Sequence, residues 1–475
     1  MTAHTSIGIP YAPQPRPLVG HALRLRRDPL RLLQQASRSG DTLVRLRIGS
    51  KDMLLICDAQ LTWEVLHNDT VYDKGGPLIE LVRELVGDGL ATCPRTRHRA
   101  YRRQLQPVFA PDHAYDYLAK ASVGIQHVVS SWCHGQILDI PVEMRRLALH
   151  AAVHGLFSAE PTLDLDSIAQ DLTTILVGFA QRVARPPLLD HLPTPSNHRY
   201  TAALARFRDT VARTVRARRQ SHHEAPDDLL AALLSTDTSH GSAPLNDREI
   251  LDHAVTFITA PTATAASVMG WALHLVATHP HVAERLAAEA HANLQGNAAG
   301  PEHLPRLTFT AQVITEVLRL YPSVWLMTRI ATADTYLGGH LLDAGTVLAY
   351  SPYLIHRNPD LYPDPHRFEP GRWTSLTPTP RHAYIPYGAG PRQCIAGQSF
   401  ATNQMIICLA SVAQAWNVRP IAAAALPLRS RAAANLTPRG LHLQLTSQSH
   451  PMEHTAQLPD RPRPTAQHPR RTWHI

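Results

Sequence analysis

The chain has 475 residues, a formal charge of +8 and five cysteines. Its positive charge comes without basic runs interleaved with aromatic residues, zinc-ligand spacing or a helix-turn-helix pattern, so a nucleic-acid-binding protein is not indicated and an acidic protein partner is favoured. The cysteines are scattered without paired spacing, which argues against a disulfide framework. Because the sequence has no run of about eighteen or more apolar residues, we expect a soluble, cytoplasmic protein.

Short elements separated by turn residues make up the first part of the chain. Apolar periodicity predicts a helix, a hairpin and a second helix at residues 28–40, 42–57 and 61–68. Residues 72–94 hold clustered apolar residues between glycines and predict another short helix. The next segment, RTRHRAYRRQLQPVF, predicts a basic helix in which His98 and Arg102 are four residues apart and share a face. That face is suited to carboxylates, or it is simply a solvated basic surface.

Helical periodicity dominates the middle of the chain. Residues 114–222 predict helices separated by Pro-rich breaks, and a polar, acidic connector follows. Residues 251–280 are then apolar over a long run and predict the central helix of the fold. This run contains Pro261, which lacks a backbone N–H and clashes with the preceding turn, so we expect a kink or an opened groove there.

Charged pairs and short strands characterise the part after the central helix. Glu316 and Arg319 are three residues apart on an amphipathic helix and share a face. Residues 329–359 predict short strands and turns, and residues 435–445 predict a final hairpin. From residue 447 the chain is rich in Pro, His and Arg and poor in apolar residues, so we expect the tail to be disordered.

The most informative segment reads AYIPYGAGPRQCIAG. Gly388 and Gly390 allow a tight turn, and Arg392 places a cation two residues before Cys394. The helical periodicity that follows brings N-terminal N–H groups near the sulfur. These features favour a thiolate that binds a soft metal, although a lone cysteine is more often a small buried hydrophobe. The segment resembles the haem-binding loop of the cytochromes P450, F-G-x-G-x-R-x-C-x-G.

The resemblance covers residues 15 to about 445 and implies a mainly α fold with small β-sheets, the cytochrome P450 fold. We expect a flexible N-terminus at 1–14, the P450 domain at 15–446 and a disordered tail at 447–475. The implied cofactor is haem b, with Cys394 as the ligand of the iron. The other cofactor-binding residues implied are His98, Arg102, Arg329, Arg392, Tyr387 and Gly388. A structural triad is implied at Glu316, Arg319 and Arg372.

The resemblance also implies which residues face the substrate. In P450s these lie in the segment before the basic helix, in the central helix, in the strand at Arg329 and at the tip of the last hairpin. Packing in the core is the alternative interpretation for residues 78–82 and 324–327. The expected contacts are Leu78, Ile79, Val82, Phe257, Ala260, Val324, Trp325, Met327 and Leu436.

The cysteine loop departs from the family pattern in two ways. Tyr387 replaces Phe and brings a hydroxyl near the sulfur, where it is expected to tune the iron. Ala396 replaces Gly, and Gly397 and Phe400 each come one residue late, which predicts a one-residue insertion after Cys394. We expect the insertion to leave ligation intact and to alter the local geometry.

The central helix departs from the family pattern A/G-G-x-D/E-T-T/S as well. Thr264 keeps the alcohol, but Ala263 stands where the proton-relaying acid is expected, and Pro261 replaces Gly. The catalytic candidates are therefore Thr264 and Thr262, which, together with a substrate hydroxyl, can hold water for proton delivery. Neutral drift in an irregular helix is the alternative explanation.

Segments such as DKGGP and LPTPSN are most similar to actinobacterial terpenoid P450s typified by pentalenene oxygenase. This resemblance implies a monomeric oxidase of secondary metabolism that acts on an apolar terpenoid or prenylated substrate with O2 and electrons from ferredoxin and its reductase. The alternative, favoured by Ala263 and Pro261, is cyclisation, rearrangement or group transfer without O2 activation, in which the substrate supplies its own leaving group. A haem-binding sensor or scaffold is a third hypothesis, but no regulatory segment is visible.

Overall fold

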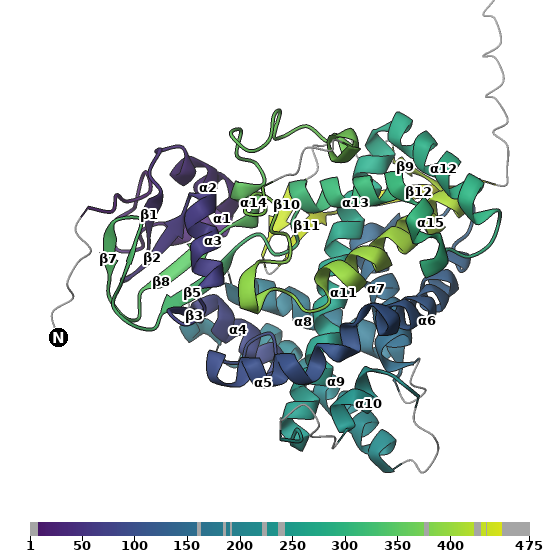
Figure 1. Cartoon of the computed structure of the whole chain (residues 1–475), viewed down its shortest axis with the longest axis horizontal. Helices are drawn as coiled ribbons and strands as arrows, with labels where there is room; N and C mark the ends of the chain where they lie inside the picture. Colours follow the sequence, from purple (N-terminus) through teal and green to yellow (C-terminus); the bar gives the residue numbers. More distant parts are fainter. Residues whose placement is uncertain are drawn as a thin grey trace, which may run out of the picture.

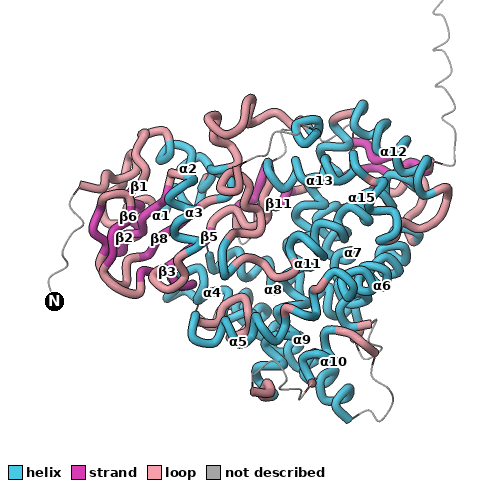
Figure 2. Tube along the Cα trace, in the orientation of Figure 1, coloured by secondary structure: helices cyan, strands magenta, loops and turns pink. Residues whose placement is uncertain are grey.

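A sheet-rich part and a larger helical part lie side by side in the fold (Figures 1 and 2). The computed structural model describes residues 8–158, 163–183, 187–190, 192–220, 226–235, 243–374, 380–421, 429–433 and 435–448. The helices of this part of the chain are α1 (Ala22–Arg27), α2 (Pro29–Ser37), α3 (Ala59–His67), α4 (Pro77–Val86), α5 (Arg95–Leu105), α6 (Pro111–Ser130), α7 (Ile140–Phe157), α8 (Leu165–Val183), α9 (Pro195–Gln220), α10 (Leu229–Leu234), α11 (Asp247–Thr278), α12 (Pro280–Leu294), α13 (Thr308–Leu320), α14 (Pro352–Ile355) and α15 (Asn403–Ala415). The strands are β1 (Leu43–Ile48), β2 (Lys51–Ile56), β3 (Tyr72–Lys74), β4 (Ile137–Asp139), β5 (Met327–Ala331), β6 (Thr335–Leu337), β7 (His340–Leu342), β8 (Val347–Tyr350), β9 (Trp416–Pro420), β10 (Arg429–Ala432), β11 (Leu436–Arg439) and β12 (His442–Ser447).

The largest sheet has five strands in the order β1-β2-β8-β5-β3. The predicted hairpin at 42–57 is confirmed, because β1 and β2 pair antiparallel. Strand β3 was not predicted, and it pairs antiparallel with β5 so that Lys74 lies directly opposite Arg329. Like charges in opposite positions repel each other, so this edge of the sheet favours a nearby anion.

Apolar clusters cover both faces of the five-stranded sheet. Because successive side chains of a strand point to opposite faces, Leu54 and Ile56 of β2 belong to one cluster, while Met53 and Leu55 belong to the other. The largest cluster lies in the helical part, where α6, α7, α11 and α15 pack together. The sheet is therefore a buried support for the loops at its edge.

Helix α11 is the central helix, packed against α7 and in contact with α9, α13 and α15. It begins at a capping box, in which Asn246 and Glu249 bond each other's backbone N–H. Buried residues occur on all its sides from Ile250 to Val276, as expected for a helix that is apolar all round. The helix continues without interruption through Pro261.

The predicted hairpin at 435–445 is wrong. Strand β11 pairs with β10, whereas β12 pairs with β4 and β9 in a different sheet. Gly440, with a φ of 66°, lies between the two strands and turns the chain from one sheet to the other. The periodicity was right for two strands but did not reveal that each has partners elsewhere in the chain.

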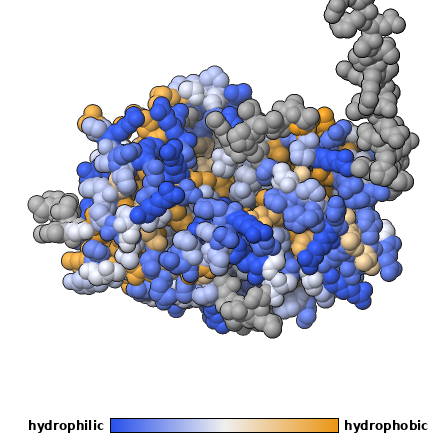
Figure 3. Space-filling model, turned by 90° about the horizontal axis from the view of Figure 1, so that it is seen from above, coloured by the Kyte–Doolittle hydropathy of each residue, from blue (hydrophilic) through white to orange (hydrophobic). Residues whose placement is uncertain are grey.

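Packed structure extends beyond both expected domain limits. The side chains of Ile9 and Ala12 are buried, and the N–H of Ala12 donates to the C=O of Arg45 (2.9 Å). At the other end β12 reaches Ser447. Residues 1–7, half of the expected flexible N-terminus, and residues 449–475, nearly all of the expected disordered tail, lie outside the described residues. Across the part that the structure describes, α-helices are all too short or too polar to cross a membrane, and the face seen in Figure 3 is mostly hydrophilic with separate apolar groups.

Candidate functional site

A cavity of about 380 Å³ lies between α11 and the loop that carries Cys394. Its walls come from α4, the middle of α11, the start of β5 and the Cys394 loop. Most of the lining is apolar, with basic side chains in addition. Such a lining with a few polar groups is typical of small-molecule sites.

Close packing against α3 shapes the Cys394 loop. Gly390 has a φ of 69°, and a Cβ there would lie 2.1 Å from the carbonyl oxygen of Leu66, so only glycine fits. A hydrogen bond from the N–H of Cys394 to the C=O of Tyr387 (3.1 Å) closes the loop. Cys394 thereby lines the cavity, together with Tyr387 and Gly388. The cysteines that do not line it are Cys57, Cys93, Cys133 and Cys408.

The environment of the Cys394 sulfur combines opposing effects. The side chain is exposed to the cavity, although the loop lies deep in the protein. Burial raises the pKa of the Cys394 thiol above its usual value, while the backbone N–H groups of Ala396 and Gly397 and the charges of Lys74 and Arg102 lower it. These donors and cations stabilise a thiolate.

A π-helical turn, Gly397–Thr402, follows Cys394 and leads into α15. The N–H of Ala401 donates to the C=O of Ala396, five residues earlier (2.9 Å). A π turn holds one residue more than an α-helical turn, and it lies where the sequence predicts a one-residue insertion. A residue inserted here would be accommodated at the start of the helix and not in the loop that presents the sulfur.

The Tyr387 hydroxyl hydrogen-bonds to Thr402 at the end of this π turn (2.7 Å). Its ring packs against Gly397, where a Cβ would lie 2.5 Å from the ring carbon Cγ. In the described part of the chain this hydroxyl makes no hydrogen bond to Cys394, and its expected tuning of the iron stays a prediction. Tyr387 ties the loop to the π turn.

Basic side chains from three elements and the Cys394 loop meet at one end of the cavity. His98 and Arg102 project from the same face of α5, as the sequence predicts. Among the described residues, the basic ones that line the cavity are Lys74, His98, Arg102, Arg329 and Arg392, and no Asp or Glu lines it. We call these five residues the cationic end of the cavity.

The cationic end has little counter-charge. Arg392 donates to the carboxylate of Asp73 (2.8 Å) and to the C=O of Cys93 (2.7 Å), but its Nε and Nη1 are buried without a hydrogen-bond partner among the described residues. Burial and the neighbouring cations lower the pKa of His98 to about 3. Burial, with smaller effects from Arg329 and Arg392, lowers the pKa of Lys74 to about 7. A group with two carboxylates, such as haem, fits this end because it supplies the missing negative charge.

Helix α11 forms the wall opposite the loop. Phe257, Ala260, Ala263 and Thr264 line the cavity, and the Thr264 hydroxyl donates to the C=O of Ala260 (2.8 Å). Thr262 is a different case from Thr264. It is 1% exposed, does not line the cavity, and its hydroxyl donates to the C=O of Ile258 (2.7 Å). The expected catalytic role of Thr262 is therefore not supported by its position.

Most of the expected substrate contacts line the cavity. Trp325 and Leu436 do not, because they are buried in the apolar cluster on one face of the large sheet. The Trp325 indole donates to the C=O of Ala433 (2.8 Å), and the C=O of Leu436 accepts from the Trp271 indole (2.8 Å). The expected contacts that line the cavity are Leu78, Ile79, Val82, Phe257, Ala260, Val324 and Met327.

Several polar residues of the cavity were missed from the sequence. Lys74 belongs to the DKGGP segment, but its charge had no expected role because β3 was not predicted. Ser323 and Asn435 also line the cavity. Asn435 directly precedes the expected contact Leu436. The sequence therefore predicted the correct turn, but the residue that lines the cavity is the one before the residue named. Thr256 lines the cavity as well, one helical turn before Ala260.

The residues of the expected structural triad lie together at α13 and do not line the cavity. Arg319 and Glu316 are fully buried and form a two-pronged ion pair with both N···O distances at 2.8 Å. Arg372 lies 3.5 Å from Glu316. Arg319 also donates to backbone carbonyls of His356, Pro365 and Arg367, so the ion pair holds the segment that follows α14. Each guanidinium nitrogen of Arg319 therefore has a hydrogen-bond partner, as a buried charge requires.

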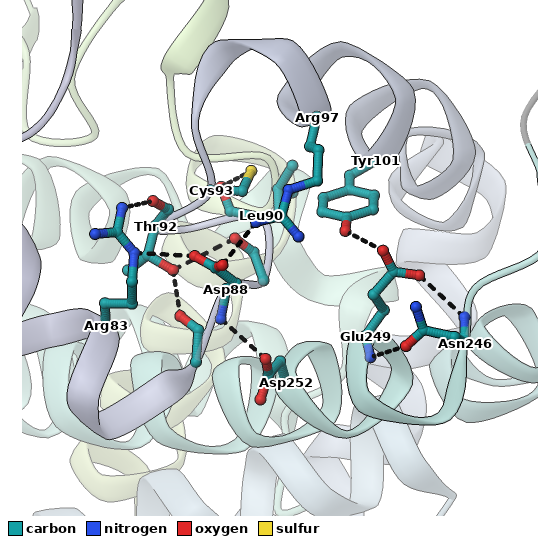
Figure 4. Close-up of polar contacts among 12 residues, drawn as sticks. Arg83, Asp88, Leu90, Thr92, Cys93, Arg97, Tyr101, Asn246, Glu249 and Asp252 are labelled. Carbon is teal, nitrogen blue, oxygen red and sulfur yellow. Dashed lines mark hydrogen bonds and ion pairs between the residues drawn. The ribbon is translucent and has the colours of Figure 1, made fainter.

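Asp252 on α11 holds the loop between α4 and α5 that covers the cavity. Its carboxylate accepts from the N–H of Asp88 (2.9 Å) and pairs with Arg208 of α9. Figure 4 shows Asp88 in turn facing Arg83 and Arg97, with N···O distances of 2.9 and 2.6 Å. Helix α9, helix α11 and the loop between α4 and α5 are thus joined through one buried carboxylate.

The comparisons with known proteins agree over nearly the whole chain. A sequence model of the family described as Cytochrome P450 matches residues 10–442. Cyclooctat-9-en-7-ol 5-monooxygenase of Streptomyces melanosporofaciens is 38% identical, over 86% of this chain and 89% of that protein. Pentalenene oxygenase of Streptomyces avermitilis is 34% identical, over 94% and 99%. The crystal structure of the cytochrome P450DA haem domain superposes with a TM-score of 0.82 at 25% identity, over 92% of this chain and 98% of that one.

Proposed function

Because this chain belongs to the cytochrome P450 family, we propose that it oxidises an apolar terpenoid or prenylated substrate with O2 and electrons from a ferredoxin. Family and fold imply haem b with cysteine thiolate ligation of the iron, so the protein is a haem-thiolate oxidoreductase. The observation that carries the substrate class is the apolar lining of the cavity opposite Cys394. The named terpenoid substrates of two relatives point the same way.

Cys394 is the proposed ligand, because it lines the cavity and the other four cysteines do not. The proposed contacts to the haem carboxylates are His98, Arg102, Arg329, Arg392 and, in addition, Lys74. His98 is neutral at physiological pH given its lowered pKa of about 3, so it acts as a hydrogen-bond donor. Arg102, Arg329 and Arg392 act as cations, and Lys74, whose pKa is lowered to about 7, is charged only in part. Bound haem supplies O2 activation and C–H oxidation, and the chain supplies position and protons.

Thr264 is the proposed site of proton handling. Its hydroxyl hydrogen is donated to the C=O of Ala260, so the lone pairs of Oγ1 are free to accept a hydrogen bond from water in the cavity. No carboxylate of the described residues lines the cavity, so protons have to pass through water at Thr264 Oγ1 or through a hydroxyl of the substrate. The apolar side chains of Phe257 and Val324 also line the cavity and offer water no hydrogen bond.

A second candidate function is suggested by the part of α11 that lines the cavity. Ala263 lines the cavity where the family pattern has an acid, and Pro261 is beside it. Without a general acid, a reaction that needs no protons from the protein is favoured: cyclisation, rearrangement or group transfer in which the substrate supplies its own leaving group.

Turnover of a panel of sesquiterpenoid and geranylated compounds separates the two functions. Each compound is incubated with ferredoxin, reductase and NAD(P)H, and in parallel without reductant in anaerobic buffer. The oxidase is supported by products that carry new oxygen and need all components. Full activity in the anaerobic arm would establish the alternative and reject the oxidase.

The proposed electron donor is an acidic iron–sulfur protein that docks on α5. Arg99 and Arg103 are exposed on this helix, whose other face carries His98 and Arg102 into the cavity. Positive charge at such a surface speeds encounter with an acidic partner. The rate of electron transfer should fall as salt is raised and fall further in Arg99→Glu with Arg103→Glu. A rate indifferent to both changes would remove this surface from the proposal.

A further inference from the structure

Two polar side chains interrupt the apolar lining of the cavity away from its cationic end. Ser323 and Asn435 both line the cavity, and the Asn435 Nδ2 donates to the Ser323 Oγ (2.8 Å). Leu176, Ala263 and Asn435 also line a second pocket of about 90 Å³, so Asn435 lies at the boundary of the cavity beside α8 and the Ala263 position of α11.

Rigid elements hold this polar pair in place. Ser323 follows α13 and is 6% exposed, and its C=O accepts from the N–H of Leu436 (3.0 Å). Asn435 is in the turn between β10 and β11, next to Leu436. The C=O of Leu436 accepts from Ser267 (2.6 Å) and from the Trp271 indole (2.8 Å), both on α11. The amide is therefore positioned before any ligand binds, which reduces the entropic cost of binding.

The pair has hydrogen-bonding capacity left over. With its Nδ2 bonded to Ser323, the Oδ1 of Asn435 accepts from no described residue, and the Ser323 hydroxyl donates to none of them. A wholly apolar ligand that displaces water from these atoms would leave them unpaired, which is costly. A ligand with its own hydroxyl or carbonyl at this place would satisfy them.

We propose that Asn435 binds an oxygen atom of the substrate and is oriented for this by Ser323, so that the enzyme prefers an already oxygenated terpenoid to a hydrocarbon. This inference rests on the proposed oxidation of a terpenoid. Asn435 contacts the substrate, and Ser323 is a positioning residue. The reaction that supplies the substrate must then leave oxygen on the skeleton, as a cyclisation ended by water or an earlier hydroxylation does.

The experiment compares ligands that differ in one oxygen function. Cedrol and cedrene, and nerolidol and farnesene, are sesquiterpene alcohols and hydrocarbons with matched carbon skeletons. Dissociation constants are measured on the haem-loaded enzyme from the shift of the Soret band on ligand binding. The wild-type protein should bind at least one alcohol about tenfold more tightly than its hydrocarbon, as expected for a satisfied buried hydrogen bond.

The variants separate a specific contact from general polarity. Asn435→Leu should bring the ratio of the affinity for the alcohol to the affinity for its hydrocarbon close to one, without weakening hydrocarbon binding. Ser323→Ala should lower the ratio by a smaller factor, because the amide remains but is less well oriented. Thr256→Val is the matched control: it removes a hydroxyl from the same cavity, but one that already donates to the C=O of Asp252 (2.6 Å), so the ratio should stay at the wild-type value.

Three results would overturn the inference. These are a wild-type ratio near one, an unchanged ratio in Asn435→Leu, and an equal loss of the ratio in Thr256→Val. If Asn435→Leu does not fold, the result for Ser323→Ala decides in its place. Failure of every alcohol and every hydrocarbon to shift the band would instead count against the proposed terpenoid substrate, and with it against the inference.

Discussion

The two sides of the cavity are built on different principles. On the side of Cys394, charged side chains dominate: the cationic end lines the cavity, and outside the cavity the buried pair of Glu316 and Arg319 is bonded to backbone carbonyls. On the side of α11, the lining is formed by apolar residues and a few hydroxyls that bond their own helix, such as Thr264. A charged network demands particular residues at particular places, whereas an apolar wall demands only volume. We call them the Cys394 side and the α11 side.

The largest expected effect is on the Cys394 side. Cys394→Ser should fold, but its reduced CO complex should lack the red-shifted Soret band of a thiolate-ligated haem, because a serine oxygen does not replace the sulfur. The measurement is an absorption spectrum of the reduced, CO-treated protein. Cys133→Ser, an exposed cysteine that does not line the cavity, is the control and should keep the band. A band retained in Cys394→Ser would exclude this residue as ligand.

The second effect tests whether the cationic end holds haem. In the double variant Arg102→Leu and Arg392→Leu, two cations are lost from a site whose described lining has no carboxylate. Hydrogen bonds to charged groups contribute about 1.5–3 kcal/mol each, so haem should transfer to an acceptor protein at least about tenfold faster. Arg103→Leu removes an exposed cation from the same helix and should leave the rate unchanged. Equal haem retention in both proteins would contradict the assignment.

Sequence alone could predict the Cys394 side well and the α11 side only in outline. Glu316, Arg319, Arg392 and Cys394 stand out because their chemistry cannot be exchanged for that of other residues. For the apolar wall, the sequence shows that Trp325 and Val324 are both apolar but not which of them faces a cavity. That choice depends on which surfaces meet after folding.

Residues brought together by long-range pairing were missed for the same reason. Lys74 reaches the cationic end because β3 pairs with β5, and Asn435 reaches the cavity because the N–H of the adjacent Leu436 donates to the C=O of Ser323. Both are contacts between segments far from the motifs in sequence.

The third effect is a pH dependence that arises on the Cys394 side. The His356 ring is fully buried, with its Nε2 accepting from the N–H of Ile385 (2.9 Å) and its Nδ1 facing the C=O of Arg319 (3.2 Å). These partners require a neutral ring, and burial lowers the pKa of His356 to about 3. The unfolded chain binds a proton near pH 6.5, so it binds more protons than the folded chain between pH 6.5 and about 3.

Stability should therefore fall as the pH drops below about 6.5. For His356 the loss amounts to about 2 kcal/mol at pH 5. His356→Gln keeps a donor and an acceptor without titrating, so the difference in free energy of unfolding between pH 7 and pH 5 should shrink by roughly this amount in urea titrations. His198→Gln, at an exposed position of α9, should leave that difference unchanged. An equal difference in the wild-type protein and in His356→Gln would reject the neutral-ring interpretation.

The smallest effect is expected for Ala263→Asp on the α11 side, where the sign of the change is informative. Ala263 lines both the cavity and the pocket of about 90 Å³ that also contains Arg145, so an introduced carboxylate has space and a cation nearby. If the enzyme activates O2 and protons limit it, the fraction of electrons recovered in product should rise and hydrogen peroxide release should fall, since a positioned general acid typically contributes ~10²–10⁴-fold. Ala263→Asn has nearly the same shape as Ala263→Asp but cannot deliver a proton, so it should show no gain.

If the native reaction needs no protons from the protein, the aspartate should leave turnover flat or reduce it, because it adds a desolvated charge beside the substrate. The sign of the change in Ala263→Asp relative to Ala263→Asn thus decides whether the missing acid limits the reaction or is not needed by it.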